Sequence, residues 1–483
     1  MADQHPHPAS PPPWLAEPGM NLTMGEAATV LGSLLRMMVG DATLRGERIC
    51  NDTRLIAAGD IFIALTGNRD GHSFVPLALE RGAAFVIVAQ WPLTMPLGAR
   101  QGALVVHDVD AALVRLASWW RMRHDILVIG IGGGVGKTTT KETVAGLLSQ
   151  RHGAEHILKT PANWNDARGL SLALLGLRDH HQRAVVEMGM DRQGEVAQLA
   201  AIARPRWGIV TSVSATHLEF FPDMAALIAT ERGMVESLPP DGLALLNSDD
   251  RLVRGMIPAA TCPVYTFGTL PGDDLRAIRL SSRGGAGLTF VAQTSEANVA
   301  VSTTLVGRHL VTSALAALSV ALADGWSLAD AASALHVVQI AQRMQFHPGI
   351  AGSTIIDDTY NASPESMLAS LDLLADWPRE QGGRRMALLG TMRELGTRSI
   401  REHHRLGRRA AARCSTLWVT GEESHHIADG ATAGGLRDVR VFATPDEAAA
   451  DCATTLAAND VLLIKASHAV GLDGIVSRLL AGS

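Results

Sequence analysis

The chain has 483 residues, of which 47% are hydrophobic and 19% charged, the composition of a globular protein. This balance excludes a fibrous or intrinsically disordered chain, and the length indicates about three domains. The formal net charge of −6 comes from 48 acidic and 42 basic side chains spread along the chain, which argues against nucleic acid as a partner. The four cysteines lie far apart and match no metal or redox spacing, so a reducing cytoplasm is expected.

Residues 1–19 are rich in proline and lack the basic and apolar regions of a secretory signal, so they are expected to form a disordered leader. The longest apolar segment, residues 310–323, includes Thr312, Ser313 and Ser319. It falls short of the roughly 18 apolar residues of a membrane span. A buried helix is expected there, and no membrane span is predicted.

Residues 20–123 are predicted to form a small α/β domain. Short apolar runs at 60–65 and 83–90 are typical of strands. Between them, residues 66–74 are polar and rich in turn formers, which predicts a loop.

Residues 124–341 alternate between strand-like and helical patterns, which predicts a parallel, doubly wound sheet. Strands are expected at 126–131, 183–189 and 207–213, and helices at 139–150, 195–203 and 224–238. The segment 277–305, rich in Gly and Thr, is expected to be a β insertion.

Residues 342–483 repeat this alternation and predict a further α/β domain. Its strands are expected at 353–358, which opens the domain, and at 385–390, 416–421, 439–444 and 461–467. An arginine-rich helix at 399–413 is expected to be a solvated basic face. The predicted fold class is therefore α/β with three domains.

The strongest local signal is the segment GGGVGKTTTKE, which lies between a predicted strand and a predicted helix. Its glycines allow backbone N–H groups to approach phosphate oxygens, and the helix N-terminus adds partial positive charge. Lys137 can then reach the β and γ oxygens of a nucleotide, and the Thr138 hydroxyl can bind Mg²⁺. Ile131 stands where the strict pattern has glycine, so the loop is a shorter variant, and a simple glycine-rich turn is the alternative. The predicted nucleotide-binding residues here are Gly133, Gly134, Gly136, Lys137, Thr138 and Thr139.

Two polar residues follow neighbouring strand patterns. Glu187 ends one predicted strand and His217 follows the next. Because the C-terminal ends of parallel strands line the ligand crevice, both side chains are expected near the same phosphates. Mg²⁺ prefers oxygen ligands, which makes Glu187 the natural choice and His217 the less obvious one. A strand-end cap and a structural histidine are the alternatives.

A series of motifs in fixed order makes the chain resemble the Mur ligases from about residue 20 onward. They are NDTRLIAAGDIFIALTGNRDGHSF at 51–74, GKTTTKE at 136–142, NWND at 163–166, EMGM at 187–190, THLEFF at 216–221, GRHLVTSALAAL at 307–318, IIDDTYNASPESM at 355–367, LLGTMRELG at 388–396 and LIKASH at 463–468. DDTYNASPESM is most similar to the family member that joins D-alanyl-D-alanine to UDP-N-acetylmuramoyl-tripeptide.

The resemblance implies an ATP-dependent ligase of peptidoglycan precursor synthesis, with ATP and Mg²⁺ as cofactors. Its substrates would be a UDP-linked muramoyl peptide and a dipeptide or amino acid, joined through an acyl phosphate. The N-terminal domain would bind the UDP-sugar, the central domain would be a P-loop ATPase, and the C-terminal domain would be Rossmann-like. A monomer is expected.

The resemblance also implies roles for individual residues. Catalysis would involve Lys137, His217, Arg232 and Asn361, and Mg²⁺ would be held by Thr138, Glu187 and His217. The substrate would contact Thr53, Arg54, Gly67, Asp70, Gly71, His72, Asn163 and Asn165. His309, Arg343 and Asp358 would contact the nucleotide.

Several positions depart from the family pattern. Mur ligases carry a carbamylated lysine near a second Mg²⁺, and we place its equivalent at Arg232, whose guanidinium cannot supply a carbamate oxygen. Leu310 and Ser313 replace two asparagines near the adenine, Thr391 replaces an aspartate, and Asp166 replaces an asparagine. Two alternatives therefore stay open: a related ligase that joins a different amine to a different carboxylate, and a non-catalytic nucleotide-binding homologue.

Overall fold

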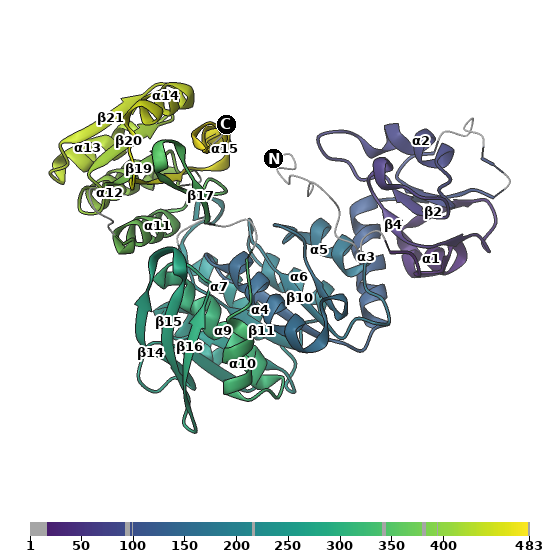
Figure 1. The fold of residues 1–483 in the computed structure, drawn as a ribbon. Coiled ribbons are helices and arrows are strands. Elements are labelled where there is room, and N and C mark those ends of the chain that lie inside the picture. The colour runs from purple at the N-terminus through teal and green to yellow at the C-terminus, as the bar shows by residue number, and fades with distance from the viewer. Residues whose placement is uncertain are drawn as a thin grey trace.

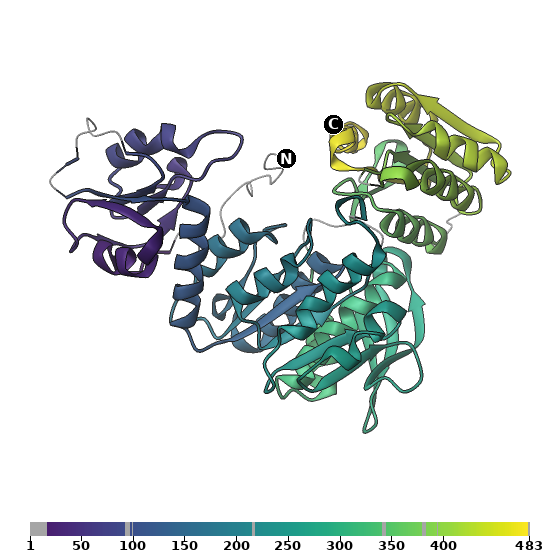
Figure 2. The same ribbon diagram turned by 180° about the vertical axis from the view of Figure 1, so that it is seen from behind.

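The structure, a computed structural model, describes residues 17–91, 97–98, 100–214, 218–340, 344–378, 383–393 and 395–481. Three α/β units follow one another along the chain, built on sheets of five, nine and six strands. The first and third units stand on opposite sides of the middle unit (Figures 1 and 2). The predicted α/β class with three domains is confirmed, while the domain limits at 123/124 and 341/342 stay predictions. Most of the predicted leader, His217 and Arg343 lie outside the described residues.

The first sheet has its strands in the order β2 (Leu35–Val39), β7 (Gly102–Val106), β6 (Phe85–Val88), β5 (Ile61–Ile63) and β4 (Ile49–Cys50). β2 is antiparallel to β7, and the other neighbours are parallel. Helices α1 (Met24–Leu31) and α2 (Val75–Glu80) and an antiparallel pair of short strands, β1 (Leu22–Thr23) and β3 (Arg45–Gly46), complete the unit. Strands therefore lie within both predicted segments, and the loop between them carries the short 3₁₀ helix η4 (Gly71–Phe74).

Helix α3 (Val109–Met122) connects the first unit to the second. It packs against α1 and also against α5 (Ala167–Leu174) and α6 (Glu195–Ala203) of the middle unit, within one continuous apolar core. The Trp120 indole N–H donates to the Leu177 carbonyl at 3.0 Å. The first unit is thus anchored by burial of apolar side chains rather than by a loose linker.

The middle sheet places the strand before the phosphate loop, β8 (Leu127–Gly132), in its interior, between β11 (Trp207–Val210) and β10 (Arg183–Glu187). Its order is β16 (Asn298–Thr303), β15 (Leu288–Gln293), β14 (Leu275–Ser282), β13 (Val264–Gly268), β12 (Leu243–Asn247), β11, β8, β10 and β9 (Ile157–Lys159). Strands from β9 to β14 run parallel, whereas β14, β15 and β16 pair antiparallel. These last three strands confirm the predicted β insertion.

Both faces of the middle sheet are covered by helices, because alternate residues of each strand point to opposite faces. Ile129 and Ile131 belong to the core that includes α4 (Lys137–His152) and α9 (Val311–Ala323). Val128 belongs to the core that includes α6 and α7 (Met224–Glu236). Helix α9 occupies the segment predicted as a buried helix. Short α8 (Arg251–Arg254) and α10 (Leu328–Leu335) complete the unit, and among the described helices none is both long and apolar enough to cross a membrane.

The third sheet has the order β17 (Gln345–Pro348), β18 (Thr354–Asp357), β22 (Val461–Lys465), β19 (Arg385–Gly390), β20 (Thr416–Thr420) and β21 (Asp438–Phe442). Its helices are α11 (Pro364–Asp376), α12 (Ser399–Ala411), α13 (His425–Ala433), α14 (Pro445–Thr455) and α15 (Asp473–Leu479). The prediction that 353–358 opens this domain is wrong, since β17 precedes it and pairs antiparallel with β18. β17 was missed because it is a poorly buried edge strand that ends in proline, with no apolar alternation.

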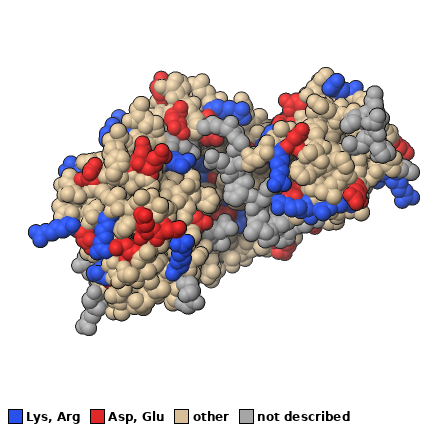
Figure 3. All heavy atoms as spheres, turned by 90° about the horizontal axis from the view of Figure 1, so that it is seen from above, with Lys and Arg blue, Asp and Glu red and all other residues tan. Residues whose placement is uncertain are grey.

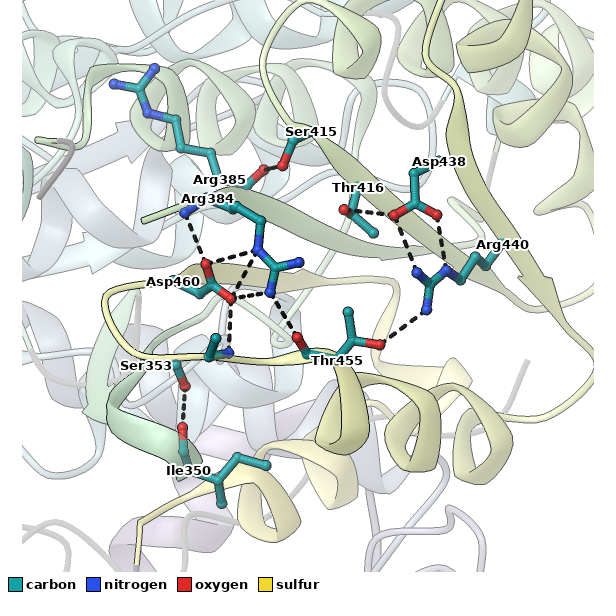
Figure 4. A network of polar contacts seen from close by, with 11 residues as sticks. Ile350, Ser353, Arg384, Arg385, Ser415, Thr416, Asp438, Arg440, Thr455 and Asp460 are labelled. Atoms are coloured by element: carbon teal, nitrogen blue, oxygen red, sulfur yellow. Dashed lines mark hydrogen bonds and ion pairs between the residues drawn. The ribbon is translucent and has the colours of Figure 1, made fainter. Parts of the chain in front are cut away.

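Asp460, just before β22, is the centre of a network of hydrogen bonds (Figure 4). Its carboxylate accepts hydrogen bonds from the Arg384 backbone N–H at 2.9 Å, from the Ala457 N–H at 2.9 Å and from the Arg384 guanidinium. Burial alone would raise the pKa of Asp460, but these donors outweigh it and hold the pKa below its usual range.

Replacing Asp460 with asparagine is expected to lower the free energy of unfolding by about 2 kcal/mol near pH 7, because a charged acceptor is lost. Since the folded pKa lies below the unfolded value of about 3.9, this stabilisation is present above that pH and fades as the pH falls through the folded pKa. Urea unfolding at several pH values measures the difference. Asp429→Asn, at an exposed position on α13, is the control, and equal unfolding midpoints for the two variants would show that the network contributes nothing.

Candidate active site

The segment after β8 forms a tight loop with no room for a side chain at Gly133 or Gly134. Gly133 has φ +121° and Gly136 has φ +90°, both in the region that favours glycine. A Cβ at Gly133 would lie 2.2 Å from Thr211 Oγ1, and one at Gly134 would lie 2.6 Å from Ser214 Oγ. The glycines therefore let the loop backbone pack against the segment that follows β11.

Hydrogen bonds to that segment fix the loop. The Gly134 N–H donates to the Ser212 carbonyl at 2.7 Å, and the Val135 N–H donates to Ser212 Oγ at 3.1 Å. Thr211 Oγ1 donates to the Val135 carbonyl at 2.8 Å. Helix α4 starts directly after the loop, and the first N–H groups of a helix have no partner within the helix. The loop and the helix N-terminus thus form a preorganised site for phosphate.

Lys137 is the buried first residue of α4. Its Nζ donates to the carbonyl oxygens of Gly133 at 2.5 Å and Gly134 at 3.3 Å. The ammonium group therefore lies over the loop, where a phosphate would bind. Thr139, also predicted to bind nucleotide, is buried behind the loop.

Thr138 and Glu187 meet at the C-terminal end of β10. Thr138 Oγ1 donates to Glu187 Oε1 at 3.2 Å, and Asn165 Nδ2 donates to the same oxygen at 3.0 Å. Glu187 is only 2% exposed, so its carboxylate is held away from water. The Asn165 backbone N–H also donates to the Asn163 carbonyl at 2.7 Å, which places both predicted asparagines in one turn beside Glu187.

Lys141 is a functional candidate that the sequence analysis missed. It is fully buried, its Nζ lies 3.4 Å from Glu187 Oε2, and it donates to the Ala162 carbonyl at 2.6 Å. It therefore connects α4, the turn with the two asparagines and Glu187. The available signal was its position four residues after Lys137, which places both lysines on one side of α4.

Replacing Lys141 with methionine is expected to lower the free energy of unfolding by about 3 kcal/mol, because it leaves Glu187 buried without its counter-charge. Adding Glu187→Gln should restore much of this loss, since the unpaired charge is then gone. Thermal and urea unfolding of the two single variants and the double variant measure the coupling. Additive losses would show that the two charges do not interact.

Arg232 does not lie where the sequence analysis placed it. Its side chain is 42% exposed on α7, where Nε pairs with Glu236 Oε1 at 2.7 Å. The preceding residue, Glu231, faces the phosphate loop instead: it is 1% exposed, and its Oε2 accepts from the Gly133 N–H at 2.8 Å. Successive residues of a helix point about 100° apart. Moving the assignment by one position therefore replaces a side chain that faces solvent with one that faces the site. The guanidinium of Arg232 thus lies at the surface of α7 rather than at the loop, and its catalytic role stays a prediction.

The predicted substrate residues of the first unit gather at the C-terminal ends of its parallel strands. Thr53 and Arg54 follow β4, and residues 67–72 follow β5. His72 Nδ1 contacts Asp70 Oδ1 at 2.7 Å, and its Nε2 accepts from the Ala89 N–H, which follows β6, at 2.9 Å. Both ring nitrogens of His72 thus hold the loop in place.

Other contacts in this region also shape the loop. The exposed Arg54 guanidinium pairs with Asp52 at 2.6 Å, and the Gly67 N–H donates to the Arg69 carbonyl at 3.1 Å. A Cβ at Gly71 would lie 2.4 Å from the Leu65 carbonyl oxygen, so only glycine fits there. In Figure 1 the first sheet stands apart from α4.

The predicted residues of the third unit surround a buried ion pair. Asp358 follows β18, and its Oδ2 lies 2.7 Å from Nζ of Lys465, the last residue of β22. Lys465 Nζ also donates to the Asn361 carbonyl at 2.6 Å, while the Asn361 side chain is exposed and accepts from the Ala362 N–H at 2.7 Å. Ser370 on α11 donates to Asp358 at 2.6 Å.

The positions near the predicted adenine site have structural contacts. Ser313 Oγ lies 2.9 Å from Thr140 Oγ1, so it connects α9 to α4. His309 is exposed beside Arg308, whose Nε pairs with Asp376 of α11 at 2.9 Å. Asp166 caps α5 by accepting from the Gly169 N–H at 2.7 Å. These departures from the family pattern are compatible with the fold.

Comparison with known proteins now identifies the class. The chain matches the family profiles of the Mur ligase middle domain over residues 131–321 and of the Mur ligase glutamate ligase domain over residues 342–468. It is 35% identical over 464 residues to a UDP-N-acetylmuramoyl-tripeptide–D-alanyl-D-alanine ligase of Synechocystis sp., covering 95% of this chain and 98% of that protein. The enzyme of that name from Escherichia coli is 30% identical over 469 residues, with 95% and 98% covered.

Solved structures agree with these sequence relatives. A MurF from Acinetobacter baumannii superimposes with a TM-score of 0.84 at 28% identity, covering 96% of this chain and 99% of that one. The MurF ligase from Thermotoga maritima in complex with ADP gives a TM-score of 0.78 at 27% identity, covering 89% and 96%. Fold, phosphate loop and relatives together define an ATP-dependent ligase. The chain belongs to the Mur ligase family.

Proposed function

We propose that this chain joins D-alanyl-D-alanine to UDP-N-acetylmuramoyl-tripeptide with the hydrolysis of ATP, a step of peptidoglycan precursor synthesis. The main support for this proposal is the phosphate loop, with Lys137 over it and the Thr138–Glu187 contact beside it. The chain is also similar over nearly its whole length to ligases of this name. A cytoplasmic location is supported by the four cysteines, which are all free and buried. A monomer stays a prediction.

The charges of Figure 3 are compatible with these partners. Over the face drawn there, Lys and Arg side chains are mixed with Asp and Glu, without an extended basic field. Small anionic substrates are then recognised locally, at strand ends, rather than by a long-range positive potential.

The reaction requires the terminal phosphoryl group to be placed next to a carboxylate. The first N–H groups of α4, which have no partner within the helix, bind the triphosphate, and Lys137 exchanges its loop carbonyls for phosphate oxygens. The substrate carboxylate then attacks the γ-phosphorus and ADP leaves, which gives an acyl phosphate. The dipeptide amine attacks its carbonyl carbon, inorganic phosphate leaves, and the amide bond is formed.

The residues beside the loop fit a magnesium ion. Thr138 Oγ1 and the Glu187 carboxylate are hard oxygen donors that already lie within 3.2 Å of each other. Mg²⁺ held by these two groups would neutralise charge on the phosphates during transfer. His217 stays a predicted ligand.

The substrate would be held by the first unit and enclosed by the third. Thr53, Arg54 and the loop 67–72 are proposed to bind the UDP-sugar, and Asn163 and Asn165 to position the peptide. Asp358 and Asn361, with Arg343 and His309, are proposed to close on the nucleotide. Because the first and third units stand apart from each other in Figure 1, catalysis would require them to approach and exclude water.

The test is phosphate release from ATP by the purified chain with Mg²⁺ and UDP-N-acetylmuramoyl-tripeptide, with and without D-alanyl-D-alanine. Release that depends on the dipeptide, with the ligated product found by mass spectrometry, is expected. Activity only with another amine would identify a related ligase of different specificity. Nucleotide binding without turnover for every acceptor would identify a non-catalytic homologue.

A further inference from the structure

Glu231 is a buried carboxylate at the phosphate loop with no role in the site described so far. It extends from α7, opposite α4 across the sheet, and its Oε2 accepts from the Gly133 N–H at 2.8 Å. The same oxygen lies 3.3 Å from the position a Cβ would take on Gly132, the last residue of β8. Glu231 thus occupies the start of the loop, where β8 ends.

Its charge is unfavourable for the ligand that the loop binds. A triphosphate is itself strongly negative, and Glu187 adds a second buried carboxylate at the end of β10, the strand next to β8. Repulsion between such charges is strong at a site shielded from water. Lys141 is paired with Glu187, and Lys137 supplies a single positive charge to a triphosphate that carries several negative ones, so further cations are expected to bind with the nucleotide.

We propose that Glu231 is a ligand of a second divalent cation that binds together with the nucleotide. The inference rests on the proposed function and adds a residue to it. Glu231 would supply, as a protein carboxylate, the oxygen that other Mur ligases obtain by carbamylating a lysine. This chain would then need no bicarbonate for its second metal site.

The geometry suits a ligand that is oriented before the metal arrives. The hydrogen bond from the Gly133 N–H orients one oxygen of Glu231, and a carboxylate has about four acceptor sites in all. Across the described ranges, no three or more His, Cys, Asp or Glu side chains form a group that could hold a metal. A cation bound mainly by phosphate oxygens, water and one or two carboxylates is the usual arrangement for Mg²⁺.

The competing explanation is that Glu231 only accepts the Gly133 N–H and shapes the loop. Glu231→Gln separates the two, because the amide oxygen keeps that hydrogen bond while the charge is lost. Glu236→Gln, the same substitution at an exposed position of α7, is the matched control.

The measurement is a titration of the full chain with Mn²⁺ and a non-hydrolysable ATP analogue, with free Mn²⁺ followed by electron paramagnetic resonance. We expect two Mn²⁺ ions per bound nucleotide in the natural chain and in Glu236→Gln, and one in Glu231→Gln. Two ions in Glu231→Gln, or one in the natural chain, would overturn the inference alone. Failure of the natural chain to bind the analogue would overturn the proposed function and the inference with it.

Bicarbonate gives a second measurement. Turnover of the natural chain should not change when bicarbonate is added or removed by degassing, and stimulation by bicarbonate would contradict the inference. Glu231→Lys should bind its second Mn²⁺ only when bicarbonate is present, provided that circular dichroism shows it to be folded. If Glu231→Lys is unfolded, Glu231→Gln alone provides the test.

Discussion

Replacing Lys137 with alanine is expected to lower the rate of ATP-dependent ligation by about 100- to 1000-fold, while the chain stays folded. The ammonium group lies directly over the loop, and the loss of one preorganised donor at a transition state typically has an effect of this size. Its contacts are two loop carbonyls, so the substitution removes little core packing. Phosphate release and thermal unfolding measure the two effects.

Lys159→Ala is the control for this variant, since it removes a lysine from the same unit whose side chain is 45% exposed. It should keep nearly full activity. Undiminished turnover in Lys137→Ala would falsify the assignment of the phosphate loop.

The phosphate loop could be predicted because its chemistry is local. Glycines, Lys137 and Thr138 are consecutive, and the clashes that a side chain would meet at Gly133 and Gly134 explain the composition. The strand ends that carry Glu187 and Asp358 were also predictable, because parallel strands place their C-terminal ends at one edge of a sheet.

The sequence did not show which residues of a helix face the site and which face solvent. Arg232 and Glu231 are neighbours in the sequence, and only the packing of α7 on the sheet decides which one faces the loop. Lys141 was hidden for the same reason, since a lysine in a helix is normally solvated. β17 was missed because an edge strand needs no apolar pattern.

Replacing Lys465 with methionine is expected to lower the free energy of unfolding of the third unit by about 3 kcal/mol and to abolish most activity. Lys465 and Asp358 are 2% and 8% exposed, so the substitution leaves a buried carboxylate without its counter-charge. It also removes the donor that holds the Asn361 carbonyl, and with it the loop proposed to close on the nucleotide. Urea unfolding and the ligation assay are the measurements.

The double variant Lys465→Met with Asp358→Asn separates stability from chemistry. Removing both charges eliminates the uncompensated carboxylate, so most of the lost stability should return. Activity should not return, because the positions of Asp358 and Asn361 relative to the nucleotide depend on the ammonium group that connects β22 to the loop after β18. If the double variant were less stable than the natural chain by the sum of the two single losses, the two charges would be uncoupled, and the ion pair could not be what holds this loop.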